Sequence, residues 1–332
     1  IHSWGRKQGF VFGAAVSVPA AIVASLAAWL GNFWLFSAAL AVFGASAAFA
    51  QQYRFAAADS VPAELKSRAI SWVLFGGVVA GFIGPPLAAL SKDWIPGATF
   101  AATYLVMAGL ALLAIVVLLF TRLAPTVKDA EKRKAGRPLA ELLRSADILI
   151  PMIGAATSYA LMVLVMVAAP LAMVYVCGHT TTEAAFAIQW HVVAMFAPSF
   201  ITGSIIKRIG AHLTAAIGLL LIIGAAAVNL HGISVMHFNI ALVLLGVGWN
   251  FGFIASTTML STAYRAEEAA RVQGLNEQVV FGSMAVASIA SGVLLQTIGW
   301  QSINILAIPV AAAAILLIGW GSMSGRQRPA AA

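Results

Sequence analysis

Five polar or aromatic side chains lie inside long apolar runs, where each needs a partner, a water-filled space or a ligand. They are Tyr159, Gln189, His191, Trp249 and Asn250. Histidine changes its charge near neutral pH, so His191 is a candidate for binding a substrate or relaying a proton. The alternative is a neutral histidine bonded to a neighbouring backbone group. Together the five residues form our predicted substrate-binding site.

The sequence contains none of the residue patterns that carry covalent or metal-dependent chemistry. It has no H-E-x-x-H, no G-x-S-x-G, no phosphate-binding loop and no paired carboxylates deep in an apolar run. Cys177 is the single cysteine, which excludes an internal disulfide and a cysteine-based metal cluster. We therefore expect no enzyme activity, no metal and no cofactor. Any transport would draw on a gradient of an ion or a solute instead of ATP.

The composition shows what kind of element must position these residues. Hydrophobic residues make up 61% of the 332 residues, charged residues only 9%, and the mean hydropathy is +0.95. A soluble domain carries roughly 25% charged residues, so most of the outer surface must face membrane lipid. The net charge of +8 would suggest a nucleic-acid partner in a soluble protein. Its distribution along this chain indicates membrane topology and contact with anionic lipid instead, and we expect no nucleic acid.

Ten apolar segments have a length suited to crossing a bilayer, which takes about 20 residues. Because lipid offers no hydrogen-bond partner to an open backbone, these segments are expected to be helices, giving an all-α polytopic membrane protein. The predicted spans are 9–30, 33–53, 69–90, 98–121, 147–176, 183–206, 211–229, 237–262, 273–297 and 300–321.

The basic residues mark one side of the membrane. With ten crossings the loops alternate between the two sides of the membrane. Of the 19 lysines and arginines, only Lys92 lies in the loops of one side, and the other 18 lie in the loops and chain ends of the opposite side. Cytoplasmic loops carry the excess of Lys and Arg. We therefore predict that both ends of the chain are cytoplasmic, in a plasma membrane of the bacterial inner-membrane type.

A long polar stretch divides the spans into four and six. We predict a partial N-terminal bundle at 1–121, a cytoplasmic linker at 122–146 and a six-helix C-terminal bundle at 147–332. A four-to-six division is unexpected unless two segments precede the first residue.

A weak internal repeat supports that expectation. Gly5 aligns with Gly210 at an offset of 205 residues, and Arg68 aligns with Arg271 at an offset of 203. Two similar six-helix halves would give such offsets. We therefore expect an N-terminally incomplete chain with ten of twelve helices present.

On these features the chain resembles the major facilitator superfamily, whose members have two six-helix halves joined by a long cytoplasmic loop. The family signature between helices two and three runs roughly G-x-x-x-D-R-x-G-R-K, and its end matches G-R-K at the start of this chain, although His2 stands where Asp is usual. A second copy follows a G-x4-R-x-G spacing. The glycines permit a tight turn with positive φ, and the arginines can pair with carboxylates or with helix-terminal carbonyls.

The resemblance implies a cytoplasmic latch, and the alternative is that its charges only fix topology. The residues of this predicted latch are Gly5, Arg6, Lys7, Asp59, Arg68, Gly203, Arg208 and Gly210.

The segment "GGVVAGFIGPPLAAL" resembles the glycine-proline motif on helix five of exporters in that family. Gly77, Gly81, Gly84 and Pro85 occupy the informative places, while Pro86 doubles the proline. Small residues let a neighbouring helix approach closely, and proline kinks the helix. The alternative is ordinary packing of small residues. A buried arginine that such exporters carry on helix four is absent, which weakens a proton-coupled exporter.

These observations predict a secondary transporter that moves a small organic solute by alternating access. Its direction stays open, with proton-coupled export as one possibility, and we expect a monomer. The competing interpretation is a membrane sensor or scaffold that keeps the transporter fold without transporting.

Overall fold

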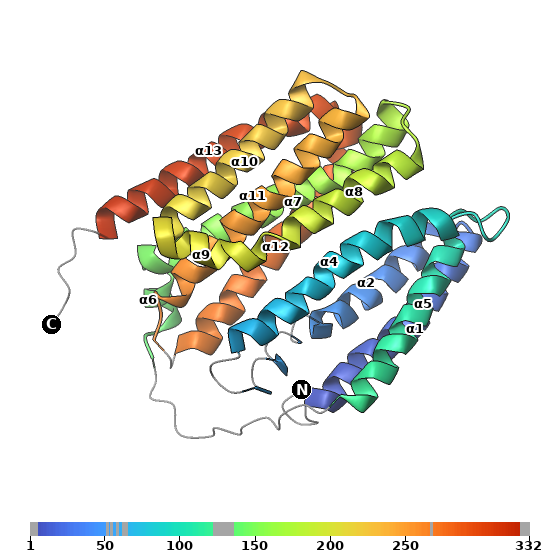
Figure 1. Cartoon of the computed structure of the whole chain (residues 1–332), viewed down its shortest axis with the longest axis horizontal. Coiled ribbons are helices and arrows are strands. Elements are labelled where there is room, and N and C mark those ends of the chain that lie inside the picture. The colour runs from blue at the N-terminus through green and yellow to red at the C-terminus, as the bar shows by residue number, and fades with distance from the viewer. Residues whose placement is uncertain are drawn as a thin grey trace. The chain divides into compact units, whose positions relative to one another are not determined.

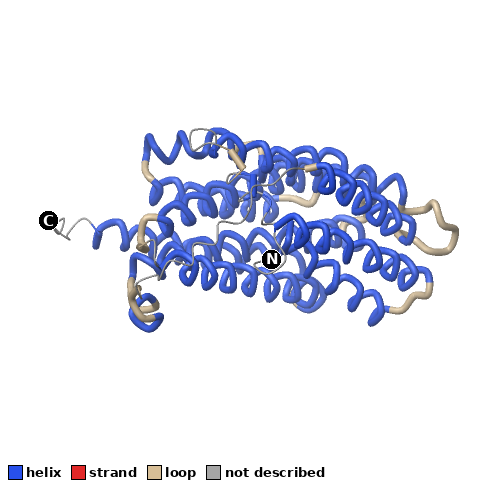
Figure 2. Tube along the Cα trace, turned by 90° about the horizontal axis from the view of Figure 1, so that it is seen from below, coloured by secondary structure: helices blue, strands red, loops and turns tan. Residues whose placement is uncertain are grey.

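The computed structural model of the chain describes residues 6–50, 53, 56–57, 60–61, 66–121, 136–265 and 268–325. Within these residues the chain is helical and has no strand, as Figure 2 shows. The predicted all-helical fold is therefore confirmed. The chain divides into two compact units, Ile1–Asp129 and Ala130–Ala332. The division falls inside the predicted linker, and each unit is described by itself.

Unit 1 contains four long helices in its described part (Figure 1). They are α1 (Arg6–Trp29), α2 (Phe33–Ala50), α4 (Lys66–Ser91) and α5 (Ala101–Phe120). Helix α1 packs against α2 and α5, and α4 packs against α5. Buried alanines along α1 allow these close approaches. Serine hydroxyls of α1 form hydrogen bonds across its interfaces with α2 and α5. Ser17 pairs with Ser46 of α2 at 2.6 Å, and Ser25 donates to the Ala101 carbonyl of α5 at 2.7 Å.

Unit 2 contains the remaining elements, which run from green to red in Figure 1. They are α6 (Leu139–Leu142), α7 (Ala146–Leu171), the π-helical η2 (Ala172–Val176), α8 (Thr181–Phe196), α9 (Ser199–Ile209), α10 (Ala211–His231), α11 (Val235–Ser261), α12 (Ala269–Thr297) and α13 (Gly299–Gly325). Helix α11 packs against α7, α8, α9 and α10, while α7 also packs against α12 and α13. The core of the unit therefore lies around α7 and α11.

Glycines explain why neighbouring helices approach α11 so closely. A Cβ at Gly218 of α10 would collide with the backbone of α11, lying 2.6 Å from the Gly248 carbonyl oxygen. On another side of α11, a Cβ at Gly246 would lie 2.7 Å from the His191 carbonyl oxygen of α8. Such contacts between small residues are a main means by which helices associate in lipid.

Each of the ten predicted segments corresponds to a helix or a helix pair. The predicted span 183–206 is not one continuous helix, because α8 and α9 meet at a bend of 46°. Pro198 lies at this bend and has no N–H with which to continue the helical bonding.

Not every long helix has the length and hydropathy of a membrane span. Among the described residues, seven helices are long and apolar enough to cross a membrane, and the bent pair makes eight. The apolar parts of α2 and α4, Phe33–Ser46 and Phe75–Ser91, are shorter. The predicted total of ten spans is therefore not established.

Large apolar side chains cover the outside of the helices. Phe120 is 85% exposed, Leu316 74% and Ile289 73%. Such side chains would be unfavourable in water, and they match the lipid surface predicted from the composition.

Candidate functional site

An aromatic cluster in unit 2 brings together side chains from four helices. Trp249 and Phe253 of α11 stack at a centroid distance of 5.3 Å and an interplanar angle of 7°. Tyr159 of α7 stands edge-on to both rings, at 5.3 Å from each. Phe196 of α8 lies 5.9 Å from Trp249, and Phe281 of α12 lies 6.0 Å from Tyr159. These five residues are called the aromatic cluster below.

Periodicity on α11 explains how the cluster is built. Trp249 and Phe253 are four residues apart, so they lie on one face of the helix, one above the other. The edge-on and stacked arrangements are those that aromatic quadrupoles favour. Trp249 is buried, whereas the other four members of the cluster are only half-buried. The cluster therefore has a covered centre and partly uncovered rings around it.

The indole nitrogen of Trp249 is the one polar atom of that buried ring. It is buried and has no hydrogen-bond partner in the described part of the chain. Aromatic rings and an unused N–H are the groups that bind a flat aromatic molecule, through ring contacts and a hydrogen bond to one of its acceptors.

His191 has a different environment from the cluster. It is fully buried in α8, and its Nδ1 lies 2.7 Å from the Leu242 carbonyl oxygen of α11. Because a carbonyl can only accept, Nδ1 carries the proton and the neutral ring leaves Nε2 as an acceptor. Nε2 has no partner among the described residues. This geometry matches the neutral, backbone-bonded alternative for His191.

Gln189 points away from His191, and its predicted contact with a substrate stays a prediction. It lies two residues earlier on α8, so its side chain projects about 200° around the helix axis from that of His191. Gln189 is half-buried.

In the described part of the chain, no group of three or more His, Cys, Asp or Glu side chains is placed to hold a metal ion.

Asn250 binds the bend between α8 and α9 to α11. Its Nδ2 donates to the Met195 carbonyl and to Ser199 Oγ, both at 2.7 Å, and its Oδ1 accepts from Thr202 Oγ1 at 2.6 Å. Asn250 is fully buried. Its amide is thus engaged within the protein at the point where Pro198 interrupts the helix, so its predicted contact with a substrate stays a prediction.

The structure brings two of the five predicted residues together and adds three that sequence reasoning missed. Tyr159 and Trp249 share the cluster, and the additional members are Phe196, Phe253 and Phe281. The spacing of four between Trp249 and Phe253 was a usable signal. The other two phenylalanines carry no signal of their own, because phenylalanine is common on lipid-facing and packed surfaces alike.

Comparison with known proteins decides the family. The model of the Major Facilitator Superfamily matches residues 1–287. The chain belongs to this superfamily. It is 43% identical over 313 residues to a riboflavin transporter, RfnT, of Brucella anthropi, covering 94% of this chain and 78% of the relative. It is also 27% identical to an uncharacterized transporter of the superfamily, YddS, of Bacillus subtilis, covering 95% of this chain and 75% of the relative.

Solved structures of the superfamily share the fold. The fucose transporter FucP in its outward conformation aligns with a TM-score of 0.61 at 16% identity, covering 95% of this chain and 83% of that one. A bacterial homologue of the iron transporter ferroportin in its inward-facing state gives 0.63 at 15% identity, covering 97% and 84%. These likenesses show the transporter fold, and membership of the superfamily makes the chain an integral membrane protein.

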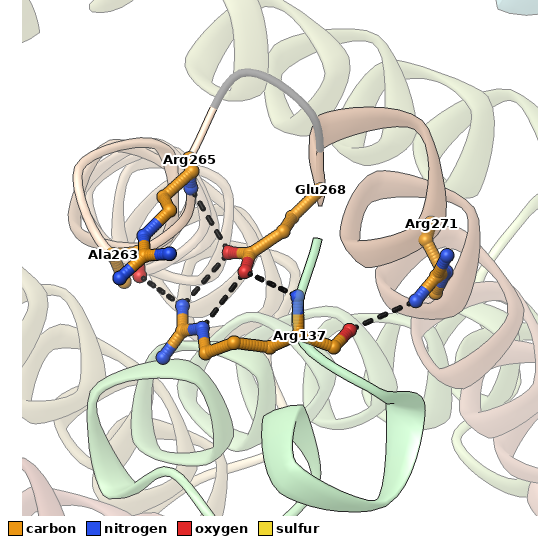
Figure 3. A network of polar contacts seen from close by, with 5 residues as sticks. All are labelled: Arg137, Ala263, Arg265, Glu268 and Arg271. Carbon is orange, nitrogen blue, oxygen red and sulfur yellow. Dashed lines mark hydrogen bonds and ion pairs between the residues drawn. The ribbon is translucent and has the colours of Figure 1, made fainter. Parts of the chain in front are cut away.

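An ionic network in this superfamily member ties the start of unit 2 to the segment between α11 and α12 (Figure 3). Arg137 donates to Glu268 through Nε and Nη2, each at 2.8 Å, and its backbone N–H donates to the same carboxylate at 3.1 Å. The Arg265 backbone N–H donates to Glu268 at 3.0 Å, and Arg271 donates to the Arg137 carbonyl at 2.9 Å. These bonds hold the Glu268 carboxylate where its side chain is buried.

The charges of the network stabilise each other. The hydrogen bond from Arg137 is the main reason that the pKa of Glu268 lies well below its usual range, and the Arg265 N–H adds to it. The same bond raises the pKa of Arg137. Gly136 lets the backbone come this close, since a Cβ there would lie 2.6 Å from Glu268 Cγ. Sequence reasoning missed this network.

The predicted latch residues are divided between the two units, and the latch stays a prediction. Gly5 and Asp59 lie outside the described residues, while Arg6 opens α1 and Arg68 lies in α4. Lys7 Nζ donates to the Leu119 carbonyl at 2.6 Å, so this residue bonds the end of α5. Such a bond to a helix-terminal carbonyl is one of the two roles expected for the basic residues of the latch.

The second copy of the signature is partly helical. Gly210 has a φ of 85° between α9 and α10, as a tight glycine turn requires. Gly203 instead lies inside α9, so the expectation of a turn at that glycine is wrong. Arg208 lies in the last turn of α9 and is exposed.

The glycine-proline motif lies within one helix. Gly77, Gly81, Gly84 and Pro85 all belong to α4, which continues to Ser91 through both prolines. Gly81 is buried, Gly77 half-buried and Gly84 exposed. A role in rocking stays a prediction.

Proposed function

We propose that this chain is a secondary transporter for riboflavin or for a solute with a similarly flat, uncharged ring system. The observation that carries the proposal is the aromatic cluster, in which Trp249 and Phe253 stack and Tyr159 stands edge-on to both. The 43% identity to a protein named a riboflavin transporter supports it. Riboflavin joins a three-ring isoalloxazine to a hydroxylated ribityl chain and has no charge at neutral pH.

Physical chemistry favours a flat ring over other solutes at this cluster. Removing apolar ring surface from water contributes roughly 25 cal/mol per Å², and each well-oriented aromatic pair adds about 0.5–1.5 kcal/mol. No member of the cluster carries a charge, so an ionised solute would be desolvated there without a counter-charge.

The proposed cycle is alternating access, in which the binding site opens to one side of the membrane at a time. The sequence has no phosphate-binding loop, so the energy would come from an ion or solute gradient. Proton coupling, export, cytoplasmic chain ends and a bacterial inner membrane belong to the same proposal. Proton coupling and the direction of transport can be tested by measuring flux in both directions with and without a pH gradient, and reporter tags on the two chain ends test the topology.

The test reconstitutes the full-length protein in liposomes and follows riboflavin flux. We expect wild-type protein to transport riboflavin and Phe253→Ala to raise KM about tenfold, because it removes one stacking surface. Phe186→Ala is the matched control, since Phe186 is a partly exposed phenylalanine of unit 2 outside the cluster. It is expected to behave as wild type.

Two outcomes would contradict the proposal. Folded wild-type protein that neither binds nor moves riboflavin would remove this solute class. Equal kinetics in Phe253→Ala and Phe186→Ala would remove the cluster as the site. Binding without flux would instead support the sensor or scaffold interpretation.

A further inference from the structure

Trp249 presents a hydrogen-bond donor that nothing in the described protein uses. The side chain is 6% exposed, and its Nε1 is buried without a partner. Indole nitrogen is a donor only, so it can be satisfied only by an acceptor. Buried polar groups without partners are rare, because burial removes the water that would otherwise bond them.

The surroundings of this indole limit what can supply the acceptor. Phe253 stacks on the Trp249 ring, and Phe196 meets it at 73°. Phenylalanine side chains have no conventional acceptor. Tyr159 approaches edge-on at 90° without giving Nε1 a hydrogen bond. The cluster thus holds the indole in place through ring contacts and leaves its N–H unused.

A second tryptophan in the same unit shows why the Trp249 position is distinctive. Trp300 of α13 also has a buried Nε1 without a partner. Its ring is 4% exposed and lies 5.3 Å from that of Phe238, which is fully buried. The rings around Trp249 are instead half-buried, so a molecule that stacks on them comes close to its N–H.

We propose that the Trp249 indole N–H donates a hydrogen bond to an in-plane acceptor on the ring of the transported solute, and that Trp249 thereby determines specificity. This inference rests on the proposed transport of a flat aromatic solute. Stacking alone would accept any ring of suitable size. A buried donor adds selectivity, because a ring with only C–H or N–H groups at that edge would leave the indole unsatisfied. Isoalloxazine has ring nitrogens and carbonyl oxygens that can accept.

The experiment compares Trp249→Phe with Trp300→Phe in the full-length protein in detergent. Phenylalanine keeps an aromatic ring for stacking and removes the N–H in both variants. We expect Trp249→Phe to raise the riboflavin Kd roughly three- to tenfold, the effect of one hydrogen bond. We expect Trp300→Phe to leave the Kd within twofold of wild type.

A spectroscopic readout separates a hydrogen bond from a change in packing. With ¹⁵N-labelled tryptophan, the indole N–H resonance that disappears in Trp249→Phe identifies this side chain. We expect that resonance to move downfield when riboflavin is added to wild type, and the Trp300 resonance to stay in place.

The outcomes distinguish this inference from the proposed function. Absence of riboflavin binding by folded wild type would overturn the proposed function and this inference with it. Riboflavin binding with an unmoved Trp249 resonance, or with the same Kd in both variants, would overturn this inference alone and leave stacking as the only role of the cluster.

Discussion

Replacing Asn250 by leucine removes three hydrogen bonds at the bend between α8 and α9 with little change in side-chain volume. In the native protein the amide donates to Met195 O and Ser199 Oγ and accepts from Thr202 Oγ1, at 2.6–2.7 Å. Leucine occupies a similar space but makes none of these bonds. We therefore expect the variant to fold with a less stable unit 2.

The size of the effect follows from the environment. Hydrogen bonds between helices in membrane bundles average about 0.6 kcal/mol, with a maximum near 1.7 kcal/mol. Three such bonds give roughly 2 kcal/mol and at most about 5 kcal/mol. Thr202 Oγ1 also lies 2.8 Å from the Pro198 carbonyl, so its one hydroxyl proton has an acceptor in the variant as well. We therefore expect a loss near the lower value, about 2 kcal/mol.

Asn229→Leu is the matched control. Asn229 is also buried, and its amide donates one bond of 2.8 Å to Asn304 between α10 and α13. Its loss is expected to cost about 0.6 kcal/mol. Titration of both variants with SDS from a mild detergent, followed by far-ultraviolet circular dichroism, gives the two free energies of unfolding on one scale.

Two results would refute this reasoning. A loss in Asn250→Leu no larger than in Asn229→Leu would show that the bonds at the bend do not stabilise it. An unchanged free energy of unfolding with a riboflavin KM raised tenfold would instead place Asn250 in contact with the solute, as its residue type suggested.

Two further predictions concern packing and charge. Gly218→Ala is expected to lower the free energy of unfolding in the same assay, because the added methyl group meets backbone atoms of α11. Gly224→Ala should change it little, because the nearest contact of its methyl group is a side-chain carbon at 4.0 Å. Equal losses in the two variants would contradict this prediction. Glu268→Gln is expected to speed hydrogen exchange at the Arg137 amide, and Glu141→Gln on the same segment should not. Since the pKa of Glu268 is lowered from 4.5, its carboxylate stays ionised as the pH falls through 4.5. The Arg137 amide should therefore lose its protection from hydrogen exchange only below that pH. Loss of this protection at pH 5 would argue against the ion pair.

The helices could be predicted from the sequence because membrane lipid imposes one strong rule on every segment. Apolar length alone located all ten segments, including 211–229, which the structure shows as Ala211–His231. The bend inside 183–206 was harder to predict. Pro198 is visible in the sequence, but its consequence depends on Asn250, which lies far along the chain and supplies the bonds around the break.

The candidate site could be predicted only in part, for a related reason. Tyr159 and Trp249 stood out because each carries a polar tip in an apolar run. Phe281 has no polar atom, so only its distance of 6.0 Å from Tyr159 identifies it. The pair of Arg137 and Glu268 was missed because the basic residues were used only to predict topology, and no spacing rule links charges so far apart in sequence.

The eight residues "GVGWNFGF" at 246–253 show how one short helical segment serves three purposes at once. Residues four apart share a face of a helix, so this segment carries three faces. On one face Gly248 lets α10 approach and Gly252 lets Ser158 of α7 approach, whereas Gly246 lies against α8 one turn before Asn250 binds the bend. Trp249 and Phe253 form the third face and the centre of the aromatic cluster. Because all three faces belong to about two turns of one helix, the ring surface and the bend are held at a fixed distance. A change at either glycine face is therefore expected to disturb both.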